Sequence, residues 1–241
     1  MTKLLCLEDS YLKECDSTVL SVNGKEVVFD QTVFYPRGGG QPSDFGKIVH
    51  SNEQFTVVNV SKKDGIVVHE LDRDCSLPVG VKVHCTIDWE RRYKLMRMHT
   101  AAHTLAATMH KEFNILITGN QLETDKTRFD FSMENFDREK FDLVIKKANE
   151  ALQNDIELKV YTLPREEAMK IPGVVKLAVA LPPSIDRLRI VEIPGIDLQA
   201  DGGTHVKNTR EVGQLSILKL DNKGKDNKRI YYTLSDTGAK I

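Results

Sequence analysis

The periodicity of the apolar residues changes once along the chain, near Asp88, and this change limits the fold more than any other feature. Before it, short apolar runs (EVVFD, QFTVVNV, GIVVHEL, VKVHCTI) alternate with turn residues and show no helical period. The dipeptide Asn23-Gly24 before the first run is a hairpin signal. Short strands at this spacing are typical of a small barrel or a curled sheet. Residues 1–87 are therefore predicted to form a β-rich, barrel-like domain.

From Asp88 onward the apolar residues recur every three and four positions, as on one face of a helix. Asp88 itself is a suitable N-cap, and a second helix is predicted to follow Asp137. Three later runs (DIELKVYTL, RLRIVEI, GQLSILKL) have the composition of strands. We therefore predict an α+β fold, with a mixed α+β domain over residues 88–241. The apolar positions of the long helix are Leu95, Met98, Ala102, Leu105, Met109 and Phe113.

Composition excludes several classes of protein. Apolar residues make up 40% and charged residues 29% of the chain, which is ordinary for a globular protein and too apolar for a disordered one. The net charge of -1 provides no global positive field that would attract nucleic acid. No window approaches the roughly 20 apolar residues of a membrane span, and the first residues lack the apolar core of a secretory signal.

The four cysteines form no CxxC pair, which argues against a zinc ribbon and gives no disulfide framework. Reduced thiols and a cytoplasmic location are therefore predicted. The cysteines are Cys6, Cys15, Cys75 and Cys85.

His99 and His103 lie four residues apart on the long helix, so that both rings project from one face, about 6 Å apart along the axis. This is the spacing of a metal-chelating pair, at the margin of the apolar stripe. The alternative is a pair of ordinary surface or boundary histidines. No glutamate follows the first histidine, so the HExxH protease motif is absent.

The stretch DGGTH supplies two further ligand candidates, Asp201 and His205. Gly202 and Gly203 permit a tight turn that can direct both side chains to one point. Three imidazoles and a carboxylate suit zinc, and the oxygen ligand leaves manganese or iron open. The alternative is a plain glycine turn.

Four motifs together resemble those of the AlaX proteins, which are stand-alone relatives of the alanyl-tRNA synthetase editing domain. These are YPRGGGQPSD (35–44), HTAAH (99–103), LPREEA (163–168) and GGTH (202–205), in the same order along nearly the whole chain. The arrangement is most similar to the two-domain type, in which a β-rich domain with the GGGQP motif precedes the editing domain. The resemblance therefore implies the same two-domain organisation here.

The resemblance implies that the chain uses zinc to remove serine from mischarged alanine-specific tRNA. Some members of the family also remove glycine. The family holds zinc through HxxxH and CxxxH motifs, which correspond to His99, His103 and His205 as ligands. Asp201 stands where the family has the cysteine. Thiolate is a soft ligand and carboxylate a harder one, so Asp201 is expected to be either the fourth ligand or a partner of the ligands.

Three side chains are expected to take part in catalysis: Gln41 of GGGQP as a polar contact, and Thr100 or Thr118 as the reader of the substrate hydroxyl. Two roles of zinc stay open: the ion activates a water molecule, or it anchors the amino group or hydroxyl of the substrate. Two other functions stay open: a metal-dependent hydrolase of small esters or amides, and a tRNA-binding module with a lapsed site.

Basic residues at two places are candidates for contact with tRNA, or else they are solvated faces. The three glycines Gly38, Gly39 and Gly40 are not a Walker loop, because GK[ST] is absent. They are expected either to let the loop of one domain pack closely against the other domain or against the end of the tRNA, or to form a structural glycine loop. The basic residues are Arg91, Arg92, Lys94 and Arg97 in the helix and Lys219, Lys223, Lys225, Lys228 and Arg229 near the C-terminus.

Overall fold

The computed structural model describes residues 2–133, 137–172, 174, 185–225 and 227–235. The chain divides into two compact units, Met1–Met96 and Arg97–Ile241, here called the first unit and the second unit. The division falls inside the long helix, α2 (Trp89–Phe113), rather than at its start. The domain boundary between residues 87 and 88 stays a prediction.

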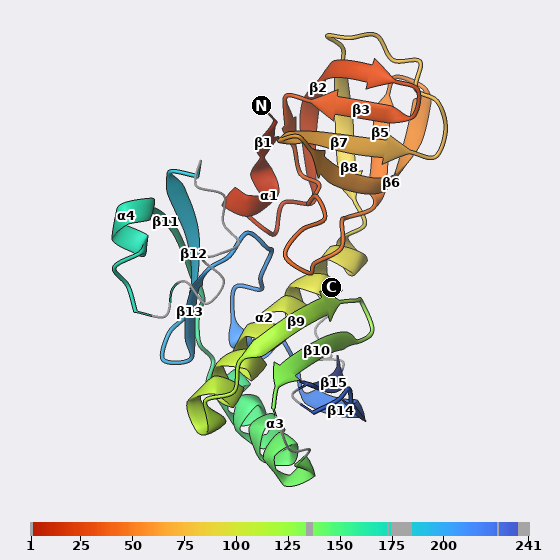
Figure 1. Cartoon of the computed structure of the whole chain (residues 1–241). Coiled ribbons are helices and arrows are strands. Elements are labelled where there is room, and N and C mark those ends of the chain that lie inside the picture. The colour runs from red at the N-terminus through yellow and green to blue at the C-terminus, as the bar shows by residue number, and fades with distance from the viewer. Residues whose placement is uncertain (1, 134–136, 173, 175–184, 226, 236–241) are drawn as a thin grey trace. The chain divides into compact units, whose positions relative to one another are not determined.

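The first unit is a closed barrel of six strands in the order β2-β3-β7-β6-β5-β8, in which β8 pairs back onto β2 (Figure 1). Neighbouring strands are antiparallel, and the predicted barrel-like β fold is confirmed. The elements are β1 (Lys3–Leu4), α1 (Leu5–Glu8), β2 (Glu14–Asn23), β3 (Glu26–Phe29), β4 (Gln31–Thr32), β5 (Gly46–His50), β6 (Glu53–Lys63), β7 (Ile66–Leu71) and β8 (Lys82–Ile87).

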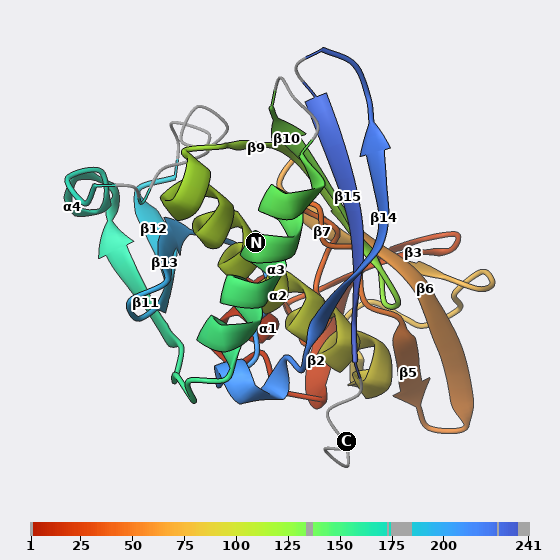
Figure 2. The same ribbon diagram turned by 90° about the horizontal axis from the view of Figure 1, so that it is seen from below.

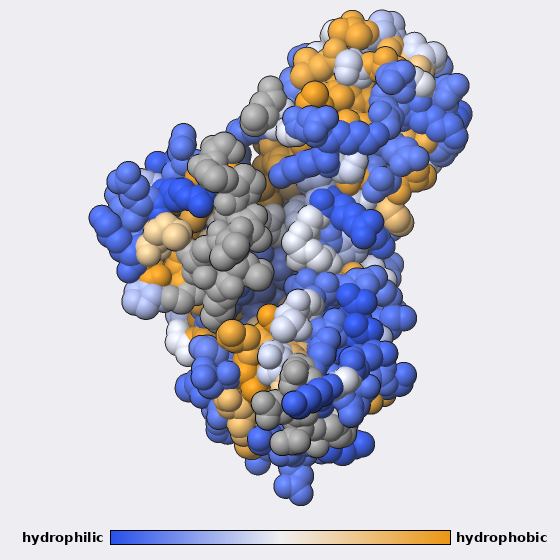
Figure 3. Space-filling model, viewed as in Figure 1, coloured by the Kyte–Doolittle hydropathy of each residue, from blue (hydrophilic) through white to orange (hydrophobic). Residues whose placement is uncertain are grey.

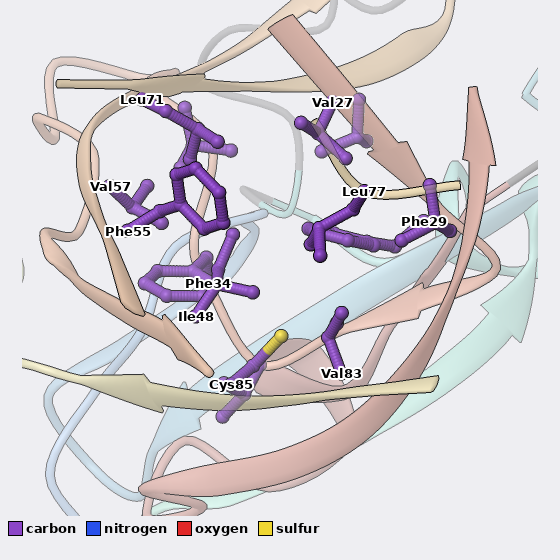
Figure 4. Close-up of a cluster of buried hydrophobic side chains, with 14 of the residues drawn as sticks. Val27, Phe29, Phe34, Ile48, Phe55, Val57, Leu71, Leu77, Val83 and Cys85 are labelled. Atoms are coloured by element: carbon purple, nitrogen blue, oxygen red, sulfur yellow. The ribbon is translucent and has the colours of Figure 1, made fainter. Parts of the chain in front are cut away.

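Alternation along the strands fills the barrel with aliphatic and aromatic side chains (Figure 4). In β3, for example, Val27 and Phe29 are fully buried while Glu26 and Val28 are only partly buried. Each large apolar side chain buried in this way contributes roughly 1.5–3 kcal/mol. The alternation that predicted strands is therefore also what closes the core.

A fully buried histidine, His69, lies in this barrel against the ring of Phe29, 4.7 Å between centroids. Its Nδ1 lies 3.2 Å from the carbonyl of Val27 and its Nε2 lies 2.8 Å from Thr32 Oγ1. A carbonyl can only accept, so Nδ1 carries the proton and Nε2 accepts from the threonine hydroxyl. Burial lowers the pKa of His69 to about 4. The ring is a neutral part of the core.

Arg92, near the start of α2, is buried in a fully enclosed ion pair with Asp44. Its guanidinium donates to both oxygens of Asp44 and to the carbonyls of Ser10 and Val33. Asp44 also accepts the backbone N–H of Tyr35 at 2.6 Å. Asp44 ends the motif YPRGGGQPSD, so this pair fixes both ends of the glycine-rich loop.

The glycines of that loop form a structural turn. Gly38 and Gln41 exchange backbone hydrogen bonds of 3.1 and 2.9 Å, and the two residues between them, Gly39 and Gly40, have φ of +59° and +87°. Two consecutive positive φ values are strained for residues other than glycine. Of the two expectations for this motif, the structural turn accounts for the glycines.

The second unit contains two sheets, of strand order β14-β15-β10-β9 and β11-β12-β13. In Figure 2, α2 and α3 lie between these sheets, which confirms the predicted mixed α+β fold. The elements are α2 (Trp89–Phe113), β9 (Ile117–Leu122), β10 (Thr127–Ser132), α3 (Arg138–Leu152), β11 (Lys159–Pro164), α4 (Arg165–Ala168), β12 (Arg187–Ile193), β13 (Asp197–Ala200), a 3₁₀ turn (Thr209–Glu211), β14 (Leu215–Asn222) and β15 (Asn227–Leu234).

Hydrogen bonds with β15 and with the residues directly after the 3₁₀ turn and after β15 hold α2 at its middle. The hydroxyl of Tyr232 donates to the carbonyl of Met98 at 3.0 Å, and the guanidinium of Arg97 donates to the carbonyls of Val212 and Ser235. Both helices begin where predicted, since Asp88 and Asp137 accept backbone N–H groups of the first turns of α2 and α3. Strands β9, β10 and β13 were not predicted.

Two expectations from composition can be compared with the structure. All four cysteines are free thiols. No helix among the described residues combines the length and the apolar composition that a membrane crossing requires.

The buried pair in the first unit gives a first prediction. Asp44→Asn leaves the Arg92 guanidinium buried without its counter-charge, which typically costs about 3–5 kcal/mol. Urea unfolding monitored through the fluorescence of Trp89, the single tryptophan, should show this loss. Glu90→Gln, which removes an exposed partner of Lys94 on the same helix, is the control and should change little. Equal stability of Asp44→Asn and the wild type would contradict the assigned role.

His69 gives a second prediction, on pH. Its folded pKa of about 4 lies below the unfolded value of about 6.5, so the unfolded chain binds the extra proton and stability falls as pH drops between these values. The free energy of unfolding should fall by about 2 kcal/mol through this group between pH 7.5 and 5. A His69→Gln variant should lose that part of the pH dependence.

The control is His84→Gln, since a hydrogen bond with Asp16 raises the pKa of the exposed His84. A raised pKa stabilises the fold at low pH, which is the opposite of the effect of His69. Removing His84 should therefore not reduce the loss of stability that occurs as the pH falls. Identical acid limbs for His69→Gln and the wild type would show that His69 does not titrate as assigned.

Candidate metal centre

Four ligand candidates meet in the second unit, delivered by three backbone segments. His99 and His103 project from one face of α2, Asp201 directly follows β13, and His205 follows the bend at Gly203. One ligand atom from each residue lies within 4.8 Å of those of the others. The structure therefore brings together all four residues that the sequence singles out.

The imidazoles pack around the carboxylate of Asp201. Its oxygens lie 3.1 Å from His205 Nε2, 3.6 Å from His99 Nε2 and 3.9 Å from His103 Nε2. The rings of His99 and His205 are stacked at 4.3 Å between centroids. All three Nε2 atoms thus point to one carboxylate.

The backbone around Asp201 holds this carboxylate in place. The N–H of Gly203 donates to Asp201 Oδ2 at 2.6 Å, and the guanidinium of Arg189 donates to the Asp201 carbonyl at 3.0 Å. The Asp201 side chain is 16% exposed, while the three histidine side chains are 1–7% exposed. The cluster is therefore most accessible at Asp201.

Burial and neighbouring groups shift the pKa of His99, His205 and Asp201. Burial lowers the pKa of His99 well below its usual range and the pKa of His205 to about 4. Burial alone would raise the pKa of Asp201, but the neighbouring His99, His205 and His103 hold it below its usual value. Neutral imidazoles and an ionised carboxylate are the forms that bind a metal cation.

The outward nitrogens of two rings also have partners. His103 Nδ1 lies 3.0 Å from Asp197 Oδ2, and His205 Nδ1 lies 3.1 Å from Thr100 Oγ1. Contacts of this kind orient the histidines of metal sites.

Comparison with known proteins gives family matches at both ends of the chain. The family of tRNA synthetases class II (A) matches residues 4–91, and the second additional domain of threonyl and alanyl tRNA synthetases matches residues 188–231. The second match contains the DGGTH stretch.

Full-length relatives decide the family. The chain is 49% identical to the alanyl-tRNA editing protein AlaX-M of Saccharolobus solfataricus over 97% of this chain and 99% of that protein. It is 46% identical to the AlaX-M protein of Methanosarcina barkeri over 98% and 100%. The chain belongs to the AlaX-M family. This confirms the predicted family and its class of activity, alanyl-tRNA editing.

The chain also resembles part of a larger enzyme. It is 40% identical to the alanine–tRNA ligase of Ignicoccus hospitalis over 90% of this chain but only 24% of the ligase. The similarity is thus limited to one portion of the ligase.

The geometry of the four residues fits a tetrahedral ion. Zinc bonds of about 2.0–2.2 Å place tetrahedral ligand atoms roughly 3.3–3.6 Å apart. Asp201 Oδ1 lies 3.6 Å from His99 Nε2 and 3.9 Å from His103 Nε2, and Asp201 Oδ2 lies 3.1 Å from His205 Nε2, which are distances close to that range. The set of three nitrogens and one oxygen could hold a divalent metal ion.

The three expected catalytic residues lie in different surroundings. Thr100 is buried, and its hydroxyl contacts His205 Nδ1 and accepts the N–H of Val206 at 3.4 Å. Thr118 is exposed on β9. Gln41 is buried in the glycine-rich loop of the first unit. Contact of any of the three with substrate stays a prediction.

Several basic residues proposed for tRNA contact are structural instead. Arg92 and Arg97 are buried and bind the carboxylate and carbonyls described above. Lys228 is 1% exposed, and its ammonium donates to the carbonyls of Gly224 and Lys225. A surface role for these three was wrong, because charge alone does not show where a side chain points. The surface over β9 and β10 is nonetheless largely hydrophilic (Figure 3).

Two polar residues beside the cluster were missed from the sequence: Asp197 and Gln199. Both lie on β13, where residues two apart share a face of the strand. The alternation of Asp197, Gln199 and Asp201 was the available signal. It was overlooked because only the stretch DGGTH, with its predicted glycine turn, was considered.

Metal content tests whether Asp201 is a ligand. Asp201→Ala should weaken zinc binding at least as much as the 10–100-fold loss that is typical when a partner of a ligand is removed. Asp201→Cys should retain zinc because thiolate is a good zinc ligand. Elemental analysis and competition with a chromophoric chelator measure both effects.

The control is Asp142→Ala, which removes an exposed carboxylate of α3. It should bind zinc as the wild type does. Unchanged affinity in Asp201→Ala would remove Asp201 from the ligands.

Proposed function

We propose that this chain hydrolyses the ester bond of tRNA(Ala) mischarged with serine, and also with glycine, using one zinc ion bound by His99, His103, His205 and Asp201. The observation that carries the proposal is the convergence of three Nε2 atoms on the Asp201 carboxylate. The AlaX-M relatives, which are named alanyl-tRNA editing proteins, support the tRNA substrate.

The residues of the site would divide the work. When bound, zinc supplies Lewis acidity toward water or toward the amino group or hydroxyl of the aminoacyl group. The buried, neutral rings of His99 and His205 offer lone pairs without competing for protons. Gly203 and Arg189 fix the position of Asp201 through hydrogen bonds. The reacting ester would approach the cluster from the side of Asp201, where the cluster is most exposed.

The charge of the site also favours this chemistry over a lapsed site. A carboxylate among three buried imidazoles is costly unless each group is paired or a cation is bound. Asp201 accepts a backbone N–H and has all three imidazoles nearby, so the residue that departs from the family motif still faces the site. This arrangement supports a working ligand set rather than a degenerate one.

The reaction would take place in the cytoplasm, where charged tRNA is used. Exposed basic groups that stay available for phosphate contact include Lys225 and Lys219, although Lys219 also pairs with Asp221 at 2.9 Å. Contacts with phosphate would make binding fall steeply with added salt.

Deacylation assays test the proposal. Purified protein is incubated with seryl-, glycyl- and alanyl-tRNA(Ala), with and without chelator. We expect release of serine and glycine, little release of alanine, and loss of activity on chelation. His103→Ala should lower the rate on the order of 100-fold or more, since a metal ion supplies several kcal/mol of transition-state stabilisation.

His110→Ala is the matched control, because His110 is an exposed histidine of the same helix outside the cluster. It should keep full activity. Activity that survives in both His103→Ala and the chelated enzyme would overturn the metal site. Equal hydrolysis of small esters without tRNA would identify the alternative hydrolase.

A further inference from the structure

Asp197 and His103 form a buried pair behind the metal-binding face. Asp197 lies on β13, in register with Ile193 of β12, and its side chain is 1% exposed. Its Oδ2 lies 3.0 Å from His103 Nδ1, the nitrogen that points away from Asp201. The Nε2 of the same ring lies 3.9 Å from Asp201 Oδ1. One imidazole therefore bridges two carboxylates through its two nitrogens.

The chemistry of Asp197 decides where the proton of this ring lies. An ionised carboxylate is an acceptor only, and a neutral imidazole has one donor nitrogen and one acceptor nitrogen. Two acceptors that face each other at 3.0 Å would repel. A proton on His103 Nδ1 removes that repulsion and leaves the lone pair of Nε2 free toward Asp201.

Gln199 competes with Asp197 for the same nitrogen, because an amide nitrogen can only donate a hydrogen bond. Its Nε2 donates to the same Asp197 oxygen at 2.7 Å and lies 2.6 Å from His103 Nδ1. With the amide turned over, its oxygen would face Asp197 Oδ2 at that short distance, and two acceptors would again be opposed. A hydrogen bond to an ionised carboxylate is charge-assisted and about twice as strong as one from a neutral amide, so Asp197 decides the position of the His103 proton and Gln199 donates to Asp197.

We propose that Asp197 is a positioning residue, which keeps the proton of His103 on Nδ1 and so directs its Nε2 lone pair to the metal ion. The inference rests on the metal site of the proposed function. It adds that a metal-competent tautomer is already set in the metal-free protein. Asp197 contacts a ligand and not the substrate, so its effect on hydrolysis passes through His103.

The first measurement reads the tautomer without any metal. Long-range ¹H–¹⁵N NMR of metal-free protein labelled at histidine should show His103 protonated at Nδ1. In Asp197→Ala the ring should become a mixture or shift to the Nε2–H form. A wild-type His103 protonated at Nε2, with Gln199 donating to Nδ1, would overturn the proposal.

The second measurement is zinc affinity by chelator competition. Asp197→Ala should weaken zinc binding 10–100-fold, the loss typical for partners of metal-ligating histidines. Asp197→Asn keeps the shape and an acceptor oxygen but loses the charge, so we expect a smaller loss. Because Asn is nearly isosteric with Asp, this variant tests the proposal even if Asp197→Ala does not fold. Wild-type zinc affinity in a folded Asp197→Ala protein, or in Asp197→Asn where Asp197→Ala does not fold, would overturn the proposal, whatever the tautomer.

Two further variants separate this inference from the proposed function. Asp130→Asn removes a largely buried carboxylate of the same unit that pairs with Arg229, and it should leave zinc affinity and the His103 tautomer unchanged. His103→Ala removes the ligand itself. If His103→Ala loses zinc while both Asp197 variants bind normally, the positioning role fails and the metal site stands. If His103→Ala also binds normally, the metal site fails with it.

Discussion

The burial of three imidazoles and one carboxylate at a single point is the constraint that organises the second unit. Polar groups taken out of water cost free energy unless each is hydrogen-bonded or paired. The helical spacing of His99 and His103 fixes two rings, and the end of β13 with the bend at Gly203 fixes the other two groups. The sheet that carries β13 must therefore pack against the middle of α2, which the opposite sheet holds through Tyr232.

Two arginines of α2 show how cations can serve the interior. Arg92 and Arg97 are both buried, and each guanidinium is surrounded by oxygens, a carboxylate and carbonyls in one case and two carbonyls in the other. The planar guanidinium is suited to this role because its donors spread in several directions and its charge is weakly hydrated. Arg92 thus fixes the glycine-rich loop within the first unit, and Arg97 fixes segments near the C-terminus within the second unit.

Local periodicity and spacing explain which features could be predicted. The barrel, α2 and α3 follow from apolar alternation and helical repeats, and the four clustered residues follow from motif spacing. Strand β13 was not predicted because Asp197 and Gln199 make its sequence polar. These polar side chains face the metal-binding cluster rather than the surface. The buried position of Arg92 depends on Asp44, 48 positions earlier, and no local pattern in a single sequence reveals such a pair.

The carboxylate of Asp201 has a consequence for oxidative chemistry. A thiolate can be oxidised stepwise to sulfenic, sulfinic and sulfonic acids, whereas a carboxylate does not undergo these oxidations. All four cysteines of this chain, Cys6, Cys15, Cys75 and Cys85, belong to the first unit. Peroxide that reaches the protein therefore finds its thiols in the first unit, and the cluster of His99, His103, Asp201 and His205 contains no sulfur atom that could be oxidised.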